Sequence, residues 1–176
     1  MKNFPPINKI ETHIRIADIS DLPNIVAIYN QAVPTRRSTA NTTPWTVESR
    51  TVWFTEHIPD KHPIFVVEID GQVVGWCGLS VYRPGRFALR HTAEISYYID
   101  SNFHRRGIGK ALLYHALDVC PTINIRNVIA VIIDRNESSR KLLEALGFEQ
   151  WAYLPRVIDF DGQEFGEYYY GKRVTD

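Results

Sequence analysis

The chain has 176 residues, of which 44% are hydrophobic and 23% are charged. That length suits one domain with a substantial core, and the composition excludes a disordered tail, a collagen and a coiled coil. Its 20 basic and 20 acidic residues give a formal net charge of zero. Proteins that bind a nucleic acid through its phosphates usually carry a basic excess, so we expect no nucleic-acid partner.

The N-terminus predicts neither a secretion signal nor a membrane anchor. Residues 1–12 resemble a loose leader, and no run approaches the ~18 apolar residues of a membrane span. The two cysteines, Cys77 and Cys120, lie among apolar residues and form no metal-binding pattern. We interpret them as buried free thiols of a reducing compartment. We therefore expect a cytoplasmic protein with no membrane partner and no bound metal.

The first part of the single domain that we assign to residues 13–174 contains one strand and two helices. Period-two alternation predicts a strand over residues 13–16. Ser20 or Asp21 caps the first helix. A polar stretch rich in Thr, Ser and Asn is expected to be a loop, and the second helix follows from Thr46.

The middle of the chain is predicted to be a three-stranded meander followed by a helix. Asp70-Gly71 is typical of a two-residue hairpin turn between strands over 64–69 and 73–81. A third strand covers residues 92–99, and a helix covers 107–119. The meander predicts antiparallel pairing.

The last part of the chain is predicted to add three strands and a helix. An apolar run over 128–133 is short enough for a buried strand, and a helix over 136–146 ends at Gly147. Two final strands are predicted over residues 148–153 and 165–172, with a turn at residues 161–162 between them. The order β-α-α-β-β-β-α-β-α-β-β predicts a mixed α+β fold, with about seven mostly antiparallel strands and about four helices.

The segment between the strand at 92–99 and the helix after it carries the strongest chemical signal. The first turn of a helix presents unpaired N–H groups and a partial positive charge, and glycines let a ligand approach the backbone closely. Flanking Arg and Lys residues add full charges. The segment therefore predicts a phosphate-binding loop, formed by Arg105, Arg106, Gly107, Ile108, Gly109 and Lys110.

Two common nucleotide-binding motifs do not fit this segment. A Walker loop needs Ser or Thr after Gly-Lys, but Ala111 follows here, and His104 stands where the first glycine belongs. A dinucleotide fingerprint needs Gly or Ala at the position of Leu112. The alternative at this point is a glycine-rich helix start whose charges face water.

Further landmarks are spread along the chain on both sides of this segment. With the Arg105–Lys110 segment they are Ile28-Tyr-Asn-x-Ala-Val33, Trp53-Phe-x-x-His57, Arg90-His-Thr-Ala-Glu94, Asn136-Glu-Ser-Ser139 and Leu146-Gly-Phe148. Together they resemble the GCN5-related N-acetyltransferase (GNAT) superfamily, and in particular its phosphinothricin/methionine sulfoximine acetyltransferase branch. The resemblance covers about residues 13 to 173.

The resemblance implies the GNAT fold and acetyl-CoA as cofactor. In that superfamily the cofactor's pyrophosphate lies on the glycine-loop amides, and its pantetheine arm pairs with the fourth strand like an added strand. The implied residues for the arm are Tyr97, Tyr98, Ile99, Asn136 and Ser139. Asn136 is equally well explained as a helix N-cap, and one side chain can do both.

The resemblance also implies a direct transfer of the acetyl group to an amine. Glu94 corresponds to the proposed general base, which takes a proton from the acceptor's ammonium group. Arg83, Arg86 and Tyr29 are the implied acceptor-binding residues. A guanidinium fork suits a carboxylate, which favours an amino acid as acceptor. Alternatives are solvated loop arginines and an edge glutamate with no chemical role.

Two positions depart from the pattern of the superfamily. His104 occupies the first motif position, where Gln or Arg is usual, and Leu143 stands where many relatives carry a tyrosine. The predicted function is N-acetylation of a small amino acid or analogue, by a homodimer. The alternatives are a non-catalytic acyl-CoA sensor and an acetyltransferase for protein N-termini or lysines.

Overall fold

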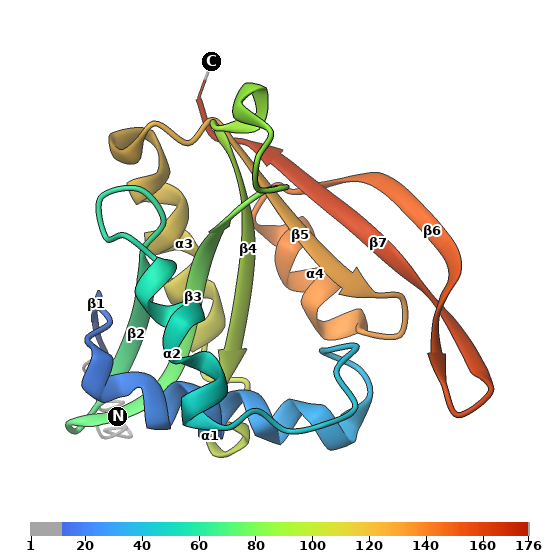
Figure 1. Ribbon diagram of the computed structural model, residues 1–176, viewed down its shortest axis with the longest axis horizontal. Helices are drawn as coiled ribbons and strands as arrows, with labels where there is room; N and C mark the ends of the chain where they lie inside the picture. The colour runs from blue at the N-terminus through green and yellow to red at the C-terminus, as the bar shows by residue number, and fades with distance from the viewer. Residues whose placement is uncertain (1–11, 176) are drawn as a thin grey trace, which may run out of the picture.

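The computed structural model describes residues 12–175 and contains a seven-stranded mixed sheet (Figure 1), with the strand order β1-β2-β3-β4-β5-β7-β6. The predicted leader lies almost wholly outside the described residues. The strands are β1 (His13–Ile16), β2 (Ile64–Ile69), β3 (Gln72–Val81), β4 (Thr92–Ile99), β5 (Asn127–Ile133), β6 (Glu149–Phe160) and β7 (Gln163–Arg173). The helices are α1 (Leu22–Ala32), α2 (Val47–Glu56), α3 (Ile108–Val119) and α4 (Glu137–Ala145). The order of strands and helices confirms the sequence prediction.

The helices form a layer on each face of the sheet (Figure 1). Buried side chains of α3 and α4, among them Leu112 and Leu143, pack with Ile95 of β4 in the larger hydrophobic cluster. Residues of α1, including Ile25 and Ile28, form a separate cluster with the opposite face of β2 and β3. Alternation along each strand therefore decides which helix layer a side chain meets.

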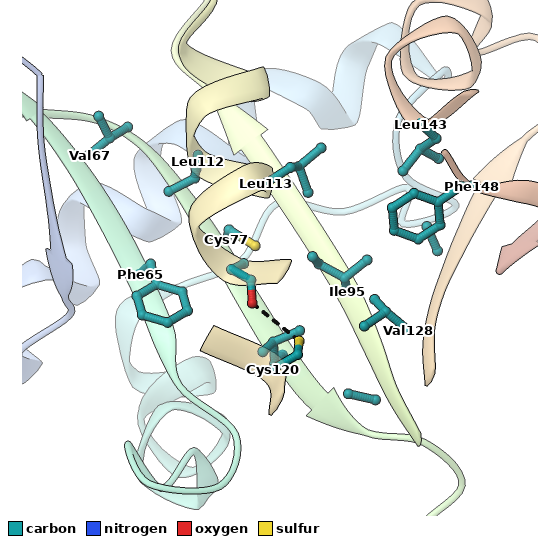
Figure 2. Packing of buried hydrophobic residues seen from close by; sticks show 14 of the residues in the cluster. Phe65, Val67, Cys77, Ile95, Leu112, Leu113, Cys120, Val128, Leu143 and Phe148 are labelled. Carbon is teal, nitrogen blue, oxygen red and sulfur yellow. Dashed lines mark hydrogen bonds between the residues drawn. The ribbon is translucent and has the colours of Figure 1, made fainter. Parts of the chain in front are cut away.

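The larger core includes the two cysteines (Figure 2). Cys77 and Cys120 are buried and free, as the sequence predicted. The Sγ of Cys120 donates a hydrogen bond to the carbonyl of Ala116, at 3.2 Å. Burial raises the pKa of the Cys120 thiol to about 12 and raises that of Cys77 as well. Both therefore remain unreactive thiols at neutral pH.

An aromatic cluster fills the other face of the sheet. Tyr29 of α1 stacks on Trp45, with ring centroids 3.3 Å apart, and meets Tyr98 of β4 edge-on at 4.8 Å. Trp53 of α2 packs edge-on against Trp76 of β3 at 5.7 Å. These rings attach α1, α2 and the loop between them to the sheet, because aromatic side chains bury the most area per residue.

The sheet opens between β4 and β5. These two strands run parallel, but they pair only over Thr92–Glu94 with Asn127–Ile129. Beyond Glu94 they separate toward their C-terminal ends (Figure 1), while β5 continues to pair with β7 along its length. The second half of β4 thus has one open edge in the middle of the sheet.

The C-terminal hairpin is longer than the sequence predicted. β6 runs to Phe160, although the expected strand ended at residue 153. The ladder is irregular between Leu154 and Ile158, where Pro155 has no N–H to donate and Arg156 adopts φ +57°. This irregularity hides the strand from a period-two reading. The Asp161-Gly162 turn has positive φ at both residues, which is typical of a tight hairpin.

No helix within residues 12–175 has the length and apolar character that crossing a bilayer requires.

Candidate functional site

The loop between β4 and α3 presents a row of free backbone amides. Arg105 and Gly107 have φ values of +60° and +80°, and Gly107 is the N-cap of α3. Among the described residues, no acceptor is found for the N–H groups of residues 105–110. Alternating left-handed residues followed by a helix start form a concave set of donors that suits an anion. Arg105 and Lys110 line the same cavity and add positive charge.

His104 ties this loop to the end of β4. Its Nε2 lies 2.8 Å from the carbonyl oxygen of Ile99, so this nitrogen carries the proton and donates. The residue that departs from the usual Gln or Arg therefore contributes a hydrogen bond that shapes the loop. No local sequence pattern indicates this contact, because it depends on where the chain turns after Ile99.

We expect substitutions of His104 to change the binding of an anionic ligand in a graded way. His104→Ala loses the bond to Ile99 and should weaken that binding about 3- to 10-fold, since a hydrogen bond of this kind contributes about 1 kcal/mol. His104→Gln keeps a donor and should stay within about 2-fold. Titration calorimetry with coenzyme A measures both, and equal affinities for the two variants would contradict this role.

The open edge of β4 exposes the backbone of alternate residues. The N–H of Asp100 donates to Val74 of β3, so in an antiparallel ladder Tyr98, Ser96 and Glu94 also bond toward β3. Tyr97 and Ile99 then direct their backbone groups toward the gap at β5. This assigns the edge predicted for the pantetheine arm to Tyr97 and Ile99. Tyr98, which the sequence analysis placed there as well, has its backbone turned away and contributes its side chain.

The start of α4 forms the opposite wall of the gap. The Oδ1 of Asn136 accepts a hydrogen bond from the N–H of Ser139, at 3.2 Å, and thereby caps the helix. Its Nδ2 reaches the Oγ of Ser38 at 3.4 Å, in the loop between α1 and α2. Asn136 is buried, and both it and Ser139 line the cavity. The structure thus shows Asn136 as the N-cap of α4. The same side chain also lines the cavity between β4 and β5.

One cavity of about 460 Å³ connects these parts. It runs from the glycine loop through the gap between β4 and β5 to the inner side of α1, where Ile28 and Gln31 lie. It includes nearly all of the predicted cofactor-binding residues; Arg106 instead lies over the Phe103 ring and donates to the carbonyl of Asn102. An extended chain with an anionic end fits this shape, with amides for the anion and a strand edge for the chain.

Glu94 lies at the point where β4 and β5 begin to separate. It is opposite Ser80 of β3 and beside Ile129 of β5, and its side chain is partly buried. Burial, together with the nearby charge of Glu167, raises the pKa of Glu94 above that of an ordinary glutamate. A carboxylate with a raised pKa is a better proton acceptor near neutral pH.

The predicted acceptor-binding residues do not gather as the sequence suggested. Tyr29 is buried; its hydroxyl bonds Thr39 at 2.6 Å, so it shapes the loop and does not face the cavity. Arg86 is exposed, and within the described part of the chain only its backbone forms hydrogen bonds, with Arg83 and Leu89. Arg83 adopts φ +52°. Burial raises the pKa of Tyr169, and Arg83 is close enough for its charge to oppose that shift. Of the three, only Arg83 lies near Tyr169, a residue that is also close to Glu94.

Two residues of β7 belong to this region and were missed from the sequence. Glu167 affects the pKa of Glu94, and Tyr169 is influenced by both carboxylates. Tyr168 and Tyr170 point to the opposite face, where the hydroxyl of Tyr170 donates to Glu144 at 2.8 Å. Strand alternation could have separated Tyr169 from its neighbours, but only the sheet order shows that β7 lies next to β5.

The comparisons with known proteins agree with this geometry. The model of the acetyltransferase (GNAT) family matches residues 25–148. YwnH of Bacillus subtilis, provisionally named a phosphinothricin acetyltransferase, is 36% identical over 92% of this chain and 99% of its own. The L-methionine sulfoximine/L-methionine sulfone acetyltransferase of Pseudomonas aeruginosa is 33% identical over 88% of each chain. A phosphinothricin acetyltransferase from Sinorhizobium meliloti, solved with acetyl-CoA, has a TM-score of 0.86 at 29% identity, covering 92% of this chain and 88% of its own.

The chain belongs to the GNAT acetyltransferase family, and it is an acetyl-CoA-dependent N-acetyltransferase. Its own residues fit that cofactor. The amides of residues 105–110 can hold a diphosphate, and the free edge of Tyr97 and Ile99 can pair with the amides of the pantetheine arm.

Proposed function

We propose that the protein transfers the acetyl group of acetyl-CoA to the α-amine of a small amino acid or analogue, of the phosphinothricin or methionine sulfoximine kind. The observation that carries the proposal is the position of Glu94. It lies at the inner end of the opened sheet, with its pKa raised, on the same strand that offers a free edge to the cofactor. Acetyl-CoA supplies an activated acyl carbon when bound.

Glu94 takes a proton from the acceptor, directly or through one water. At neutral pH an α-amine is largely an ammonium ion and has no lone pair for attack. The partly buried carboxylate removes this proton more readily than an exposed glutamate would, because burial raises its pKa. A free backbone N–H on the open edge of β4 donates to the carbonyl oxygen as negative charge develops there.

A contact between two distant loops favours a small acceptor. Arg36, in the loop after α1, forms an ion pair with Asp161 in the β6–β7 turn and lies over the ring of Phe160. This contact joins two segments 125 residues apart in the sequence. We infer that this closed contact leaves less room for a peptide chain than an open groove would. Arg83 supplies the guanidinium for the acceptor's carboxylate.

An acceptor screen tests the proposal. Release of the thiol from acetyl-CoA is followed with amino acids, phosphinothricin, methionine sulfoximine and peptides that carry free N-termini or lysines. Turnover on one or more of the small amino acids is the expected result. Turnover on peptides alone would favour the protein-directed alternative, and tight cofactor binding without turnover on any amine would favour the sensor. The departures from the family pattern at His104 and Leu143 are the reason to consider a sensor. His104, however, stabilises the loop between β4 and α3 through its hydrogen bond to Ile99.

The pH dependence of turnover tests the environment of Glu94. Because Glu167 raises the pKa of Glu94, Glu167→Gln should lower that pKa and shift the acidic limb of the kcat/KM profile to lower pH, by less than about one unit. Burial, the larger cause, remains in this variant. An acidic limb that stays unchanged, or that shifts to higher pH, would contradict the interaction between Glu94 and Glu167.

We also propose that the protein forms a homodimer in a reducing, cytoplasmic compartment. The edge strand β6 exposes Trp151, Tyr153, Leu154 and Val157, and a long apolar edge of this kind is usually covered. The buried free thiols suit a reducing compartment. Sedimentation at micromolar concentration should give a dimer, and Trp151→Asp should give a monomer; a wild-type monomer would contradict the proposal.

A further inference from the structure

The hydroxyl of Tyr97 has no role in the acetyl transfer described above. It is buried and has no hydrogen-bond partner of good geometry among the described residues. The side chain leaves β4 on the face covered by α3 and α4, packs against the larger core, and lines the cavity. A buried hydroxyl without a partner costs stability, so its presence calls for a ligand or a functional reason.

The cavity that Tyr97 lines has both apolar and polar walls. Ile95, Ile132 and Leu142 are among its apolar residues, and Ser139 at the start of α4 is the polar neighbour whose hydroxyl affects the pKa of Tyr97. Leu143, the α4 position where the family resemblance implied a tyrosine, is fully buried in the core and offers no donor. A ligand atom beside Tyr97 would therefore meet the phenol hydroxyl as a donor, close to Ser139.

Tyr97 lies between the two ends of the predicted cofactor path. The diphosphate loop begins after Ile99, and Glu94 lies three residues before Tyr97, about 10 Å along the strand. The thioester has to lie between the loop and Glu94, on the open edge to which Tyr97 contributes its backbone. We propose that the Tyr97 hydroxyl donates a hydrogen bond to the sulfur of acetyl-CoA and stabilises the thiolate that leaves. This inference depends on the acetyl transfer proposed above.

Tyr97 donates a hydrogen bond to the sulfur but does not transfer its proton to it. Burial raises the pKa of Tyr97 to about 12, whereas a thiol has a pKa of about 8.5, so the proton stays on the phenol oxygen. Glu94 accepts one proton of the ammonium group. The amine nitrogen then forms the bond to the acetyl carbon, and the carbon–sulfur bond breaks with its electron pair on sulfur. The second nitrogen proton reaches the sulfur or the solvent through water.

Binding of two cofactor analogues tests this role without turnover. Coenzyme A and desulfo-coenzyme A, which lacks the sulfur, are titrated calorimetrically into the wild type and Tyr97→Phe at pH 9. The wild type should prefer coenzyme A by about tenfold, because a hydrogen bond to a charged atom contributes at least that much, and Tyr97→Phe should lose the preference. A preference that survives in the variant, or an equal loss of affinity for both analogues, would overturn the inference.

The stability of the free protein provides a second readout. Removing an unpartnered buried hydroxyl should leave the Tm of Tyr97→Phe unchanged or raise it by about 2–4 °C, and a lower Tm would mean that the hydroxyl already bonds within the protein. Tyr114→Phe, on the exposed side of α3, is the matched control that changes neither analogue binding nor Tm. Failure of the wild type to bind either analogue would refute the proposed function itself, whereas binding of both without discrimination would refute only the role of Tyr97.

Discussion

Glu94→Gln should lower kcat by about 10²- to 10⁴-fold while the affinity for coenzyme A stays within about 2-fold. The amide keeps the shape of the side chain but cannot accept the ammonium proton, and general-base catalysis contributes a factor of this size. Glu94 lies at the separation of β4 and β5, away from the anion-binding amides, so its loss should not affect the cofactor. Steady-state kinetics and calorimetry together measure both quantities.

The same substitution should make the protein more stable at neutral pH. The pKa of Glu94 is raised in the folded state, so the folded protein favours the protonated carboxyl. Stability from this group is present below the unfolded pKa and is lost as the pH rises through the folded pKa. Thermal denaturation of Glu94→Gln should show a higher Tm than the wild type at pH 7 and no difference at pH 4.

A matched control separates the role of Glu94 from a general effect of lost charge. Glu149→Gln removes a carboxylate from an exposed position of β6 and should leave both kcat and the pH dependence of Tm unchanged. Turnover by Glu94→Gln at the wild-type rate would remove Glu94 as the base, and a wild-type Tm profile would contradict its raised pKa.

Gly109→Asp should raise the KM for acetyl-CoA at least 100-fold without unfolding the protein. The new carboxylate would stand among the amides that hold the diphosphate, where like charges repel strongly outside bulk water. Space is available, since a Cβ at Gly109 meets only the flexible end of Leu142 at 3.4 Å and Ile99 at 3.7 Å. An acidic residue in the first turn of α3 is itself favourable to the helix. The Tm should therefore stay within a few degrees of the wild type.

Ala111→Asp is the control for the added charge. Ala111 lies two residues further on, exposed and outside the lining of the main cavity, so the same carboxylate there should raise the KM less than about 3-fold. Equal effects of the two substitutions would mean that the loop attracts the cofactor only through its overall charge. An unchanged KM in Gly109→Asp would contradict the placement of the diphosphate.

The sequence predicted the fold well because its local signals agree. Asp70-Gly71 and Asp161-Gly162 set two hairpins through positive φ values, and Gly147 ends α4 in the same way. Val128 to Ile133 was identified as a buried strand from its apolar run, and it lies inside the sheet. The end of β6 was missed, because Pro155 interrupts a strand that resumes after an irregular pair.

The site was predictable only in part, since much of it depends on pairing between distant segments. The free amides of residues 105–110 follow from a local helix start, and all of these residues except Arg106 line the cavity. The register between β3 and β4 decides which backbone groups of β4 are free to pair with a ligand. Those of Tyr97 are free, whereas those of Tyr98 point toward β3. The proximity of Glu167 to Glu94 depends on the sheet order, which no local pattern encodes.

A crystal structure of the protein with coenzyme A tests the account most directly. We predict the diphosphate on the backbone amides between Arg105 and Lys110, and the pantetheine amides paired with the open edge at Tyr97 and Ile99. The sulfur should lie between the Tyr97 hydroxyl and the carboxylate of Glu94. Coenzyme A bound elsewhere, or an arm that leaves the open edge of β4 unpaired, would contradict the account.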